Sequence, residues 1–245
     1  LDNCQKRHLI TFKKFFTMKL ENNAALVTGA SRGIGLSITK ALIKAGVLVA
    51  VWSRSKPENF SHKNFYHFSV DLTNELSVQK GYEETIAKLG RQIPILINNA
   101  GAGHKGKFED ISTEKWRTLF NLNVHGIFYT TRLLIPGMKE QQEGHIINIS
   151  SGAGTNGIAG MACYSATKHA VAGLSESLHL ELRDHGIKVT CLSPGSVDTG
   201  FSDSKKNKLL PDDLADSVIH ILSMPKNHHY TDIQVRPLQP NKTAG

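Results

Sequence analysis

The pair of residues best suited to chemistry is Tyr164 and Lys168, which stand four positions apart in a YSATK stretch. A free tyrosine hydroxyl has a pKa near 10, so it is a poor base at neutral pH. A lysine at i+4 shares a helix face with the tyrosine, and its cation would favour the phenolate. Tyr164 would then act as general acid in carbonyl reduction and as general base in alcohol oxidation. Taken alone, such a pair is also an ordinary feature of a helix surface.

Two further polar residues extend this candidate catalytic group. Ser151 follows an apolar run and can hydrogen-bond a substrate oxygen on which negative charge develops. Asn123, in the stretch NLNVHG, can hold a water or a backbone group that links Lys168 to solvent. Together with a glycine-rich turn near the start of the chain, these residues indicate redox chemistry at a carbonyl or alcohol.

That glycine-rich turn, TGASRGIG, occupies positions 28–35 directly after an apolar run. Glycines in such a turn let backbone amides approach a pyrophosphate, and the helix that comes after it places its N-terminus at that anion. A turn that serves packing alone would look similar, but the strand before it and the helix after it favour a nucleotide site. The residues expected to bind the cofactor here are Gly29, Ser31, Arg32, Gly33, Ile34 and Gly35.

The end of the next apolar run, VWSRS, predicts which dinucleotide is bound. An acidic residue at this point would hold a ribose 2′-hydroxyl, whereas an arginine suits a 2′-phosphate. The chain has no acid here and offers Ser53 and Arg54, with Arg32 in the glycine turn. We therefore expect NADP(H) rather than NAD(H), although both arginines would also be intelligible as solvated surface groups.

Two other strand ends are expected to line the cofactor. Asp71, followed by Leu72, either accepts a hydrogen bond from an adenine amino group or caps the helix near Thr73. The NNAG stretch contains small residues that let a cofactor pass closely, although a plain turn would read the same way. From that stretch we expect Asn99, Ala100 and Gly101 to contribute.

The elements that must position these residues alternate between apolar runs and amphipathic stretches. Continuous apolar strands alternating with helices predict parallel pairing with helices on both faces. The fold expected is α/β, a single doubly wound Rossmann-type domain, which binds ligands at the carboxyl ends of its strands. Strands are expected at 24–27, 47–52, 65–70, 93–97, 145–149, 187–192 and 233–236, and helices at 33–45, 73–89 (with Thr73 as its cap), 113–139, 162–185 and 211–224.

Composition limits the other classes of function. The 29 basic against 21 acidic residues favour anionic ligands, but no nucleic-acid recognition motif accompanies them, so no nucleic acid is expected. Three cysteines without CxxC spacing suggest reduced thiols and a cytoplasmic location. No apolar stretch approaches the roughly 20 residues of a membrane span. No His, Cys or Asp cluster has metal-ligand spacing, and no metal is expected.

The domain organisation expected is simple. Residues 1–17 are basic and aromatic and are expected to be a loose leader ahead of a natural start at Met18. A targeting or surface-anchoring role is the alternative for that segment. With no linker and no internal repeat, residues 18–245 are expected to form one NADP(H)-binding catalytic domain.

From Leu20 to Gln239 the chain resembles the short-chain dehydrogenase/reductase family in its compact subtype. The TGASRGIG stretch matches the family's TGxxxGxG turn, NNAG matches its NNAG stretch, and YSATK matches its YxxxK pair. Asn123 and Ser151 match the remaining members of the catalytic tetrad. The segment that orients the nicotinamide is matched by Pro194, Gly195, Val197 and Thr199.

The resemblance implies hydride transfer to or from C4 of the nicotinamide, with Tyr164 and Lys168 also touching the cofactor. It further implies homodimers or homotetramers built on the helices at 113–139 and 162–185. The glycine turn looks like that of 3-oxoacyl-acyl-carrier-protein reductases. The ending TDIQVRPLQP looks more like that of NADP-dependent 3-hydroxy acid and broad carbonyl reductases.

The function expected is therefore an NADP(H)-dependent oxidoreductase acting on a small carbonyl or secondary alcohol. The first alternative is a 3-oxoacyl-acyl-carrier-protein reductase, whose substrate would be an acyl-carrier-protein thioester. The second alternative is a non-catalytic NADP(H)-sensing protein.

Overall fold

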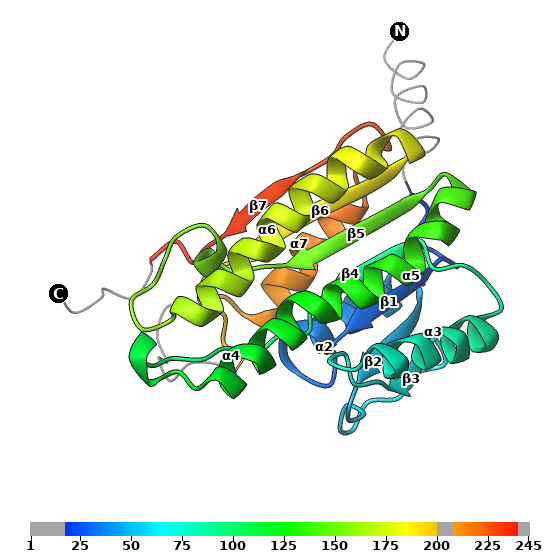
Figure 1. Ribbon diagram of the computed structural model, residues 1–245. Helices are drawn as coiled ribbons and strands as arrows, with labels where there is room; N and C mark the ends of the chain where they lie inside the picture. The colour runs from blue at the N-terminus through cyan, green and yellow to red at the C-terminus, as the bar shows by residue number, and fades with distance from the viewer. Residues whose placement is uncertain (1–17, 200–207, 240–245) are drawn as a thin grey trace, which may run out of the picture.

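A seven-stranded parallel sheet organises the part of the chain that the structure, a computed structural model, describes, namely residues 18–199 and 208–239 (Figure 1). The strand order is β3-β2-β1-β4-β5-β6-β7. The order reverses between β1 and β4, which is the switch point at which such sheets bind ligands. The strands are β1 (Ala24–Thr28), β2 (Leu48–Ser53), β3 (Phe65–Ser69), β4 (Ile95–Asn98), β5 (Gly144–Ile149), β6 (Ile187–Pro194) and β7 (Asp232–Val235).

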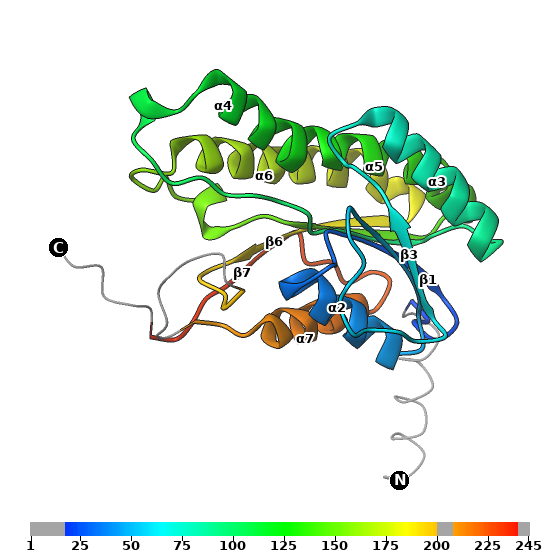
Figure 2. The ribbon, with the colours of Figure 1, turned by 90° about the horizontal axis from the view of Figure 1, so that it is seen from below.

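Helices cover both faces of this sheet, as Figure 2 shows. One face carries α3 (Glu75–Leu89), α4 (Thr113–Phe120), α5 (Gly126–Gln141) and α6 (Ala162–Leu182). The opposite face carries α2 (Gly33–Lys44) and α7 (Pro211–Leu222). The predicted α/β fold, with a parallel central sheet between two helical layers, is confirmed.

Two apolar cores form because successive strand side chains point to opposite faces of the sheet. Leu26 of β1 packs in the cluster that α3, α5 and α6 cover, whereas its neighbour Val27 packs in the cluster that α2 and α7 cover. Both side chains are fully buried. A strand buried on both faces needs apolar residues at every position, which is why these strands read as continuous apolar runs.

The start of α3 differs from the prediction. Asn74 is the N-cap, and its side chain accepts a 2.9 Å hydrogen bond from the backbone N–H of Ser77. Thr73 donates to Asp71 instead, through its backbone N–H (2.9 Å) and its hydroxyl (2.8 Å). The prediction that Thr73 caps this helix is therefore wrong. Asp71 closes a local turn and does not cap the helix.

The predicted helix over 113–139 is not continuous. A π-helical turn, Asn121–His125, separates α4 from α5. Such wide turns are rare and often occur at functional sites. Here the turn contains Asn123, whose side chain is fully buried. A periodicity of 3.6 does not reveal such a turn, because one widened turn changes the register of every residue beyond it.

The other predicted elements agree with the structure to within a few residues. Two short 3-10 helices, Phe108–Asp110 and Gly152–Gly154, were not predicted. Among the described helices, none combines the length and apolar character needed to cross a membrane. The expected leader, residues 1–17, lies outside the described residues.

Candidate active site

Tyr164 and Ser151 come together where the carboxyl end of β5 meets the first turn of α6. Ser151 follows β5 and begins the short 3-10 helix, where its hydroxyl accepts a 3.1 Å hydrogen bond from Ala153 N–H. Tyr164 is 9% exposed, and its side chain hydrogen-bonds that of Ser151. The structure thus brings together two of the predicted catalytic residues, thirteen positions apart in sequence.

The pKa of Tyr164 is raised above its usual value, because burial disfavours the phenolate. The hydrogen bond with Ser151 lowers the pKa but does not outweigh burial. The expected acidification by Lys168 is therefore wrong for the protein by itself. At neutral pH the phenol carries its proton.

Lys168 lies one helical turn further along α6 and is 4% exposed. Its ammonium donates a 2.8 Å hydrogen bond to the carbonyl of Ile149, at the end of β5. The Nζ atom lies 5.8 Å from the centroid of the Tyr164 ring. Burial lowers the pKa of Lys168 to about 8, so the group remains mostly cationic at neutral pH.

Asn123 connects the loop after β4 to α6. Its Oδ1 accepts from Ala102 N–H (2.9 Å), and its Nδ2 donates to the Ala102 carbonyl (2.9 Å) and to the Thr167 hydroxyl (3.0 Å). That hydroxyl donates in turn to the Tyr164 carbonyl at 2.7 Å. Asn123 thus holds the backbone of Ala102. Its expected role in linking Lys168 to solvent stays a prediction.

The glycine turn between β1 and α2 packs closely against the NNAG stretch. Gly29 has φ +67°, and a Cβ there would lie 2.6 Å from Ala100 Cα. A Cβ on Gly35 would lie 2.4 Å from Asn99 Nδ2, which donates to the carbonyls of Thr28 (3.0 Å) and Gly29 (3.1 Å). These two glycines therefore allow the turn to pack against the NNAG stretch.

The N-terminus of α2 fits an anion. Its N-cap is Arg32, and no side chain caps the first turn. The first turns of α3 and α4, in contrast, are capped by Asn74 and Ser112. The first backbone N–H groups of a helix have no partner within it and carry partial positive charge. This uncapped end, which includes Gly33 and Ile34, therefore suits a pyrophosphate.

Two loops approach this turn and the candidate catalytic residues. A Cβ on Gly33 would lie 3.4 Å from the Thr199 side chain, so the segment after β6 passes beside the turn. A Cβ on Gly101 would lie 3.3 Å from Asn123 Oδ1 and 3.6 Å from Lys168 Nζ. Gly195 donates through its N–H to the Val235 carbonyl at 2.7 Å, which joins that segment to β7. Pro194 and Val197 lie on the same segment.

The end of β2 carries the residues expected at the adenosine side. Ser53 is buried and donates through its hydroxyl to the Ser55 carbonyl (2.8 Å), while Arg54 and Arg32 are exposed. The two hydrogen bonds from Thr73 lower the pKa of Asp71, and the charge of Arg54 adds to that effect. Leu72 is buried. Ser31, in the glycine turn, is half-buried.

Sequence reasoning missed three residues that hold this arrangement. Thr28 accepts from the N–H groups of Asn99 and Ala100, both at 3.1 Å. Thr167 joins Asn123 to α6, and His67 contacts Ser53 from the neighbouring strand. Thr28 lies inside the TGASRGIG stretch and Thr167 inside YSATK, so their places in these motifs could have identified them. No local pattern marks His67.

Over residues 18–199 and 208–239, no three His, Cys, Asp or Glu side chains are grouped so that they could hold a metal ion.

Comparisons with known proteins identify relatives along most of the chain. The family model for short chain dehydrogenases matches residues 23–209. An uncharacterized oxidoreductase of Staphylococcus aureus is 34% identical over 233 residues, which is 89% of this chain and 99% of that protein.

Solved structures agree with this result. An alcohol dehydrogenase from Thermococcus sibiricus, complexed with 5-hydroxy-NADP, superposes with a TM-score of 0.83 at 27% identity, over 90% of this chain and 99% of that one. A 3-ketoacyl-(acyl-carrier-protein) reductase from Brucella melitensis, complexed with NADH, gives 0.80 at 29% identity, with 88% and 98% covered. A serine dehydrogenase from Escherichia coli gives 0.79 at 32% identity, with 88% and 98% covered.

Proposed function

Because the chain belongs to the short-chain dehydrogenase family of oxidoreductases, we propose that it transfers hydride between NADP(H) and a carbonyl or secondary alcohol. Tyr164 is the general acid and base in this proposal. The observation that carries it is the buried Tyr164 hydroxyl, hydrogen-bonded to Ser151 beside the Lys168 cation. A sensor without turnover would have no need of that arrangement.

Each side chain has a defined role in the proposed reduction. A nicotinamide bound here would supply the hydride. Tyr164, protonated at neutral pH because burial raises its pKa, gives its proton to the substrate oxygen. Ser151 donates a hydrogen bond to the same oxygen as charge develops. Lys168 then stabilises the phenolate, while Asn123 keeps the loop after β4 against α6.

The choice of cofactor rests on the ends of α2 and β2. The uncapped start of α2 accommodates the pyrophosphate. Arg32 and Arg54 supply cations for a 2′-phosphate where no acid follows β2. The structural relatives differ in their bound cofactor, since the Thermococcus enzyme holds an NADP derivative and the Brucella enzyme holds NADH. We favour NADP(H).

A 3-oxoacyl-acyl-carrier-protein reductase is the second candidate, and the similarity to the Brucella enzyme favours it. The ending TDIQVRPLQP, which differs from the usual ending of those reductases, favours a small free substrate instead. For that reason we keep the acyl carrier protein as an alternative partner.

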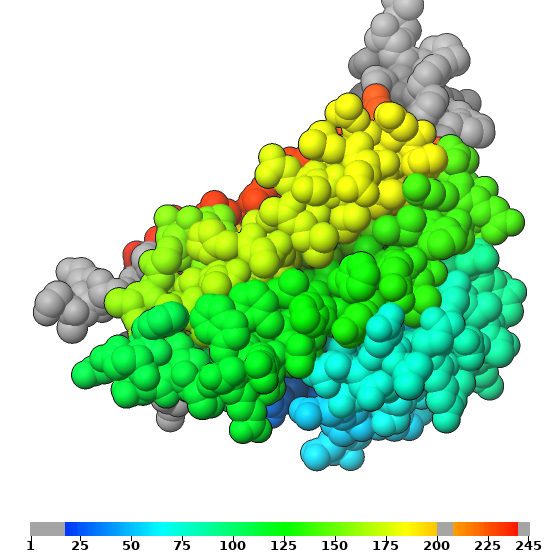
Figure 3. Space-filling model, in the orientation of Figure 1, coloured from blue at the N-terminus to red at the C-terminus, as the bar shows by residue number. Residues whose placement is uncertain are grey.

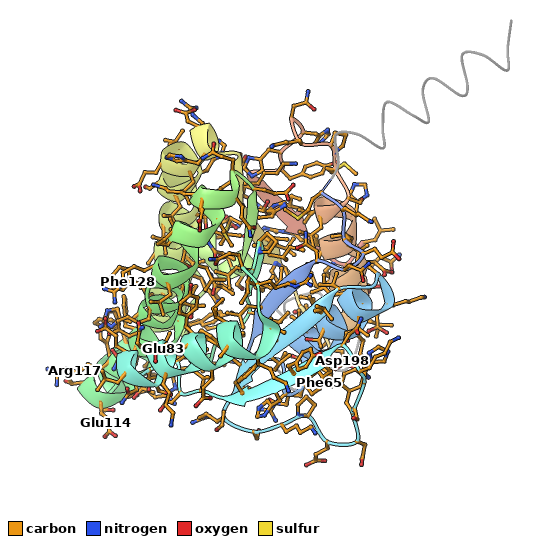
Figure 4. The ribbon with its side chains drawn as sticks, turned by 90° about the vertical axis from the view of Figure 1, so that its right-hand side faces the viewer. Phe65, Glu83, Glu114, Arg117, Phe128 and Asp198 are labelled. Carbon is orange, nitrogen blue, oxygen red and sulfur yellow. The ribbon has the colours of Figure 1, made fainter. Side chains whose placement is uncertain are left out.

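Assembly through the long helices is part of the proposal. The face made by α4, α5 and α6 is seen in Figure 3. It presents Phe128 of α5, 47% exposed, and Leu180 of α6, 54% exposed. Figure 4 shows Phe128 on the outer side of α5, away from the sheet. A homodimer or homotetramer would cover such side chains. The cytoplasmic location, expected from the cysteine pattern, stays a prediction.

Following NADPH absorbance against a panel of substrates tests the proposal. The panel contains 3-oxo acids, diketones, aldehydes and 3-oxoacyl thioesters, both free and attached to acyl carrier protein. We expect oxidation of NADPH with small carbonyls and weaker activity with NADH. Oxidation confined to carrier-bound thioesters would favour the second candidate. NADPH binding with no oxidation by any substrate would favour the sensor.

A further inference from the structure

Three consecutive backbone carbonyls accept hydrogen bonds from side chains: that of Ser53 at the end of β2, and those of Arg54 and Ser55 directly after it. The Ser53 carbonyl lies 3.1 Å from His67 Nε2, and the Arg54 carbonyl accepts from the Ser69 hydroxyl at 3.3 Å. The Ser55 carbonyl accepts from the Ser53 hydroxyl at 2.8 Å. Two of the three side-chain contacts, those of His67 and Ser69, therefore come from the neighbouring strand β3. The Ser53 carbonyl also lies 3.4 Å from the backbone N–H of Val70, which donates to it.

The proton on His67 can be assigned from these contacts. A carbonyl oxygen can only accept, so Nε2 must carry the hydrogen that it shares with Ser53. Nε2 also lies 3.2 Å from the Ser53 hydroxyl oxygen, whose own proton is directed to Ser55. His67 thus donates to both oxygens of Ser53 and fixes that residue at the end of β2.

The sheet register explains how β3 reaches this turn. In the parallel pairing of β2 with β3, Val51 is opposite His67 and Ser53 is opposite Ser69. His67 and Ser69 are two residues apart, so both point to the same face as Ser53. β3 ends the sheet order of the described strands, and it supplies donors to the segment that follows β2.

Held carbonyls matter for an anionic ligand. A carbonyl oxygen directed toward the ribose would accept a hydrogen bond from a 2′-hydroxyl but would repel a 2′-phosphate. These three oxygens already accept hydrogen bonds from the protein, so they compete less for a ligand beside Arg54, whose side chain is exposed. The neighbouring Lys56 adds a second exposed cation.

We propose that His67, assisted by Ser69, is a positioning residue that makes the Arg54 turn selective for a 2′-phosphorylated dinucleotide. The inference rests on the proposed function, because it concerns the cofactor of that same site. His67 acts through Arg54 and touches no reacting atom. Its contribution is to the relative affinity for the two cofactors and leaves the catalytic step unchanged.

The test compares His67→Val, which removes the donor, with His67→Gln, which keeps an N–H donor. Steady-state KM and kcat are measured for NADPH and for NADH. We expect His67→Val to raise the KM for NADPH about three- to tenfold, the effect of one lost hydrogen bond, and the KM for NADH by less than about twofold. kcat should not change. His67→Gln should recover most of the loss.

Two further variants keep the result interpretable. His62→Gln replaces an exposed histidine just before β3 and should behave as the wild type. Ser69→Ala, at an exposed position, should raise the KM for NADPH without affecting folding. Thermal unfolding of every variant separates lost selectivity from lost structure.

A double-mutant cycle with Arg54→Gln shows whether His67 acts through the arginine. In the Arg54→Gln background, His67→Val should have little further effect on the KM for NADPH. Equal losses for NADPH and NADH, or full additivity with Arg54→Gln, would overturn the inference. A wild type that prefers NADH would instead overturn the proposed cofactor and leave the family assignment intact.

Discussion

The ammonium of Lys168 donates a 2.8 Å hydrogen bond to the carbonyl of Ile149, two positions before Ser151. This contact fixes α6 against the carboxyl end of β5 and holds a cation close to the Tyr164 ring. Burial of an ammonium group strongly opposes folding, because the group loses its hydration. The contact therefore connects the chemistry of the site to the stability of the protein.

The pH dependence of the free energy of unfolding should reveal the buried Lys168. Burial lowers the pKa of this lysine from 10.5 to about 8, so between those values the unfolded chain binds more protons than the folded one. Stability from this group must therefore rise with pH above about 8. Between pH 8 and 10, the free energy of unfolding of the wild type should gain about 2 kcal/mol over that of Lys168→Met. Urea denaturation at each pH measures the difference.

A matched control for that experiment is Lys80→Met, since the Lys80 side chain is 77% exposed. Its difference from the wild type should stay constant over the same pH range. A constant difference for Lys168→Met as well would contradict the assigned burial of the charge.

Loss of the Tyr164 hydroxyl should abolish turnover and spare binding. For Tyr164→Phe we expect kcat to fall about 10³-fold, the usual effect of removing a general acid. The dissociation constant of NADPH, followed by fluorescence, should change little. Tyr129→Phe on α5 provides a control with the same chemical change. Substantial turnover by Tyr164→Phe would rule out the assigned proton donor.

Asn123 should be important for stability as well as for activity. Its side chain makes three hydrogen bonds, two to Ala102 and one to Thr167, and it is fully buried. Asn123→Ala leaves those partners unsatisfied and should cost about 2 to 4 kcal/mol. Asn121→Ala, at a half-buried position in the same π-helical turn, should cost less than about 1 kcal/mol. Chemical denaturation measures both, and similar losses would refute the role given to Asn123.

Two glycines with nearly the same φ distinguish the cost of the left-handed conformation from that of close packing. Gly29 has φ +67° and Gly90 has φ +62°, but a Cβ on Gly90 would have no neighbour within 4 Å. Gly90→Ala should therefore cost only about 1 to 2 kcal/mol for the left-handed conformation. Gly29→Ala places its Cβ 2.6 Å from Ala100 Cα and should cost at least about 3 kcal/mol. Equal midpoints of denaturation for the two variants would show that the contact with Ala100 does not matter.

Acid should destabilise the protein through His145, at the opposite end of β5 from Ser151. Burial lowers the pKa of His145 to about 3, so below pH 6.5 the unfolded state takes up a proton that the folded state does not. The stability from this group is lost as pH falls, at up to about 1.4 kcal/mol per pH unit. Its Nε2 donates to the Thr190 hydroxyl at 2.9 Å, since that hydroxyl donates to Tyr230.

The variant His145→Gln removes the titrating ring and keeps a donor. Its free energy of unfolding should fall less steeply between pH 6.5 and 4.5 than that of the wild type. His125→Gln, at an exposed position, should show the wild-type slope. A wild-type slope in His145→Gln would refute the assignment to this histidine.

The elements of the fold were largely predictable because their signals are local. Glycines between an apolar run and a helical stretch require a turn, which occupies positions 29–32 before α2 begins, and continuous apolar runs require strands buried on both faces. The π-helical turn at Asn121–His125 was not predictable, because its residues also suit an ordinary helix. The cap at Asn74 was missed because Thr73 beside it is an equally good cap by type.

By itself the sequence determined the parallel sheet, its two helical layers and the residue types at the strand ends, since propensity, periodicity and turn chemistry depend on near neighbours. Only the tertiary structure decided the direction of the pKa shift of Tyr164 and the depth of Lys168. It also decided that His67 reaches the turn at Arg54, with Ser69 beside it. Burial and hydrogen bonding across strands depend on segments far apart in the chain, and their packing is set by the whole fold.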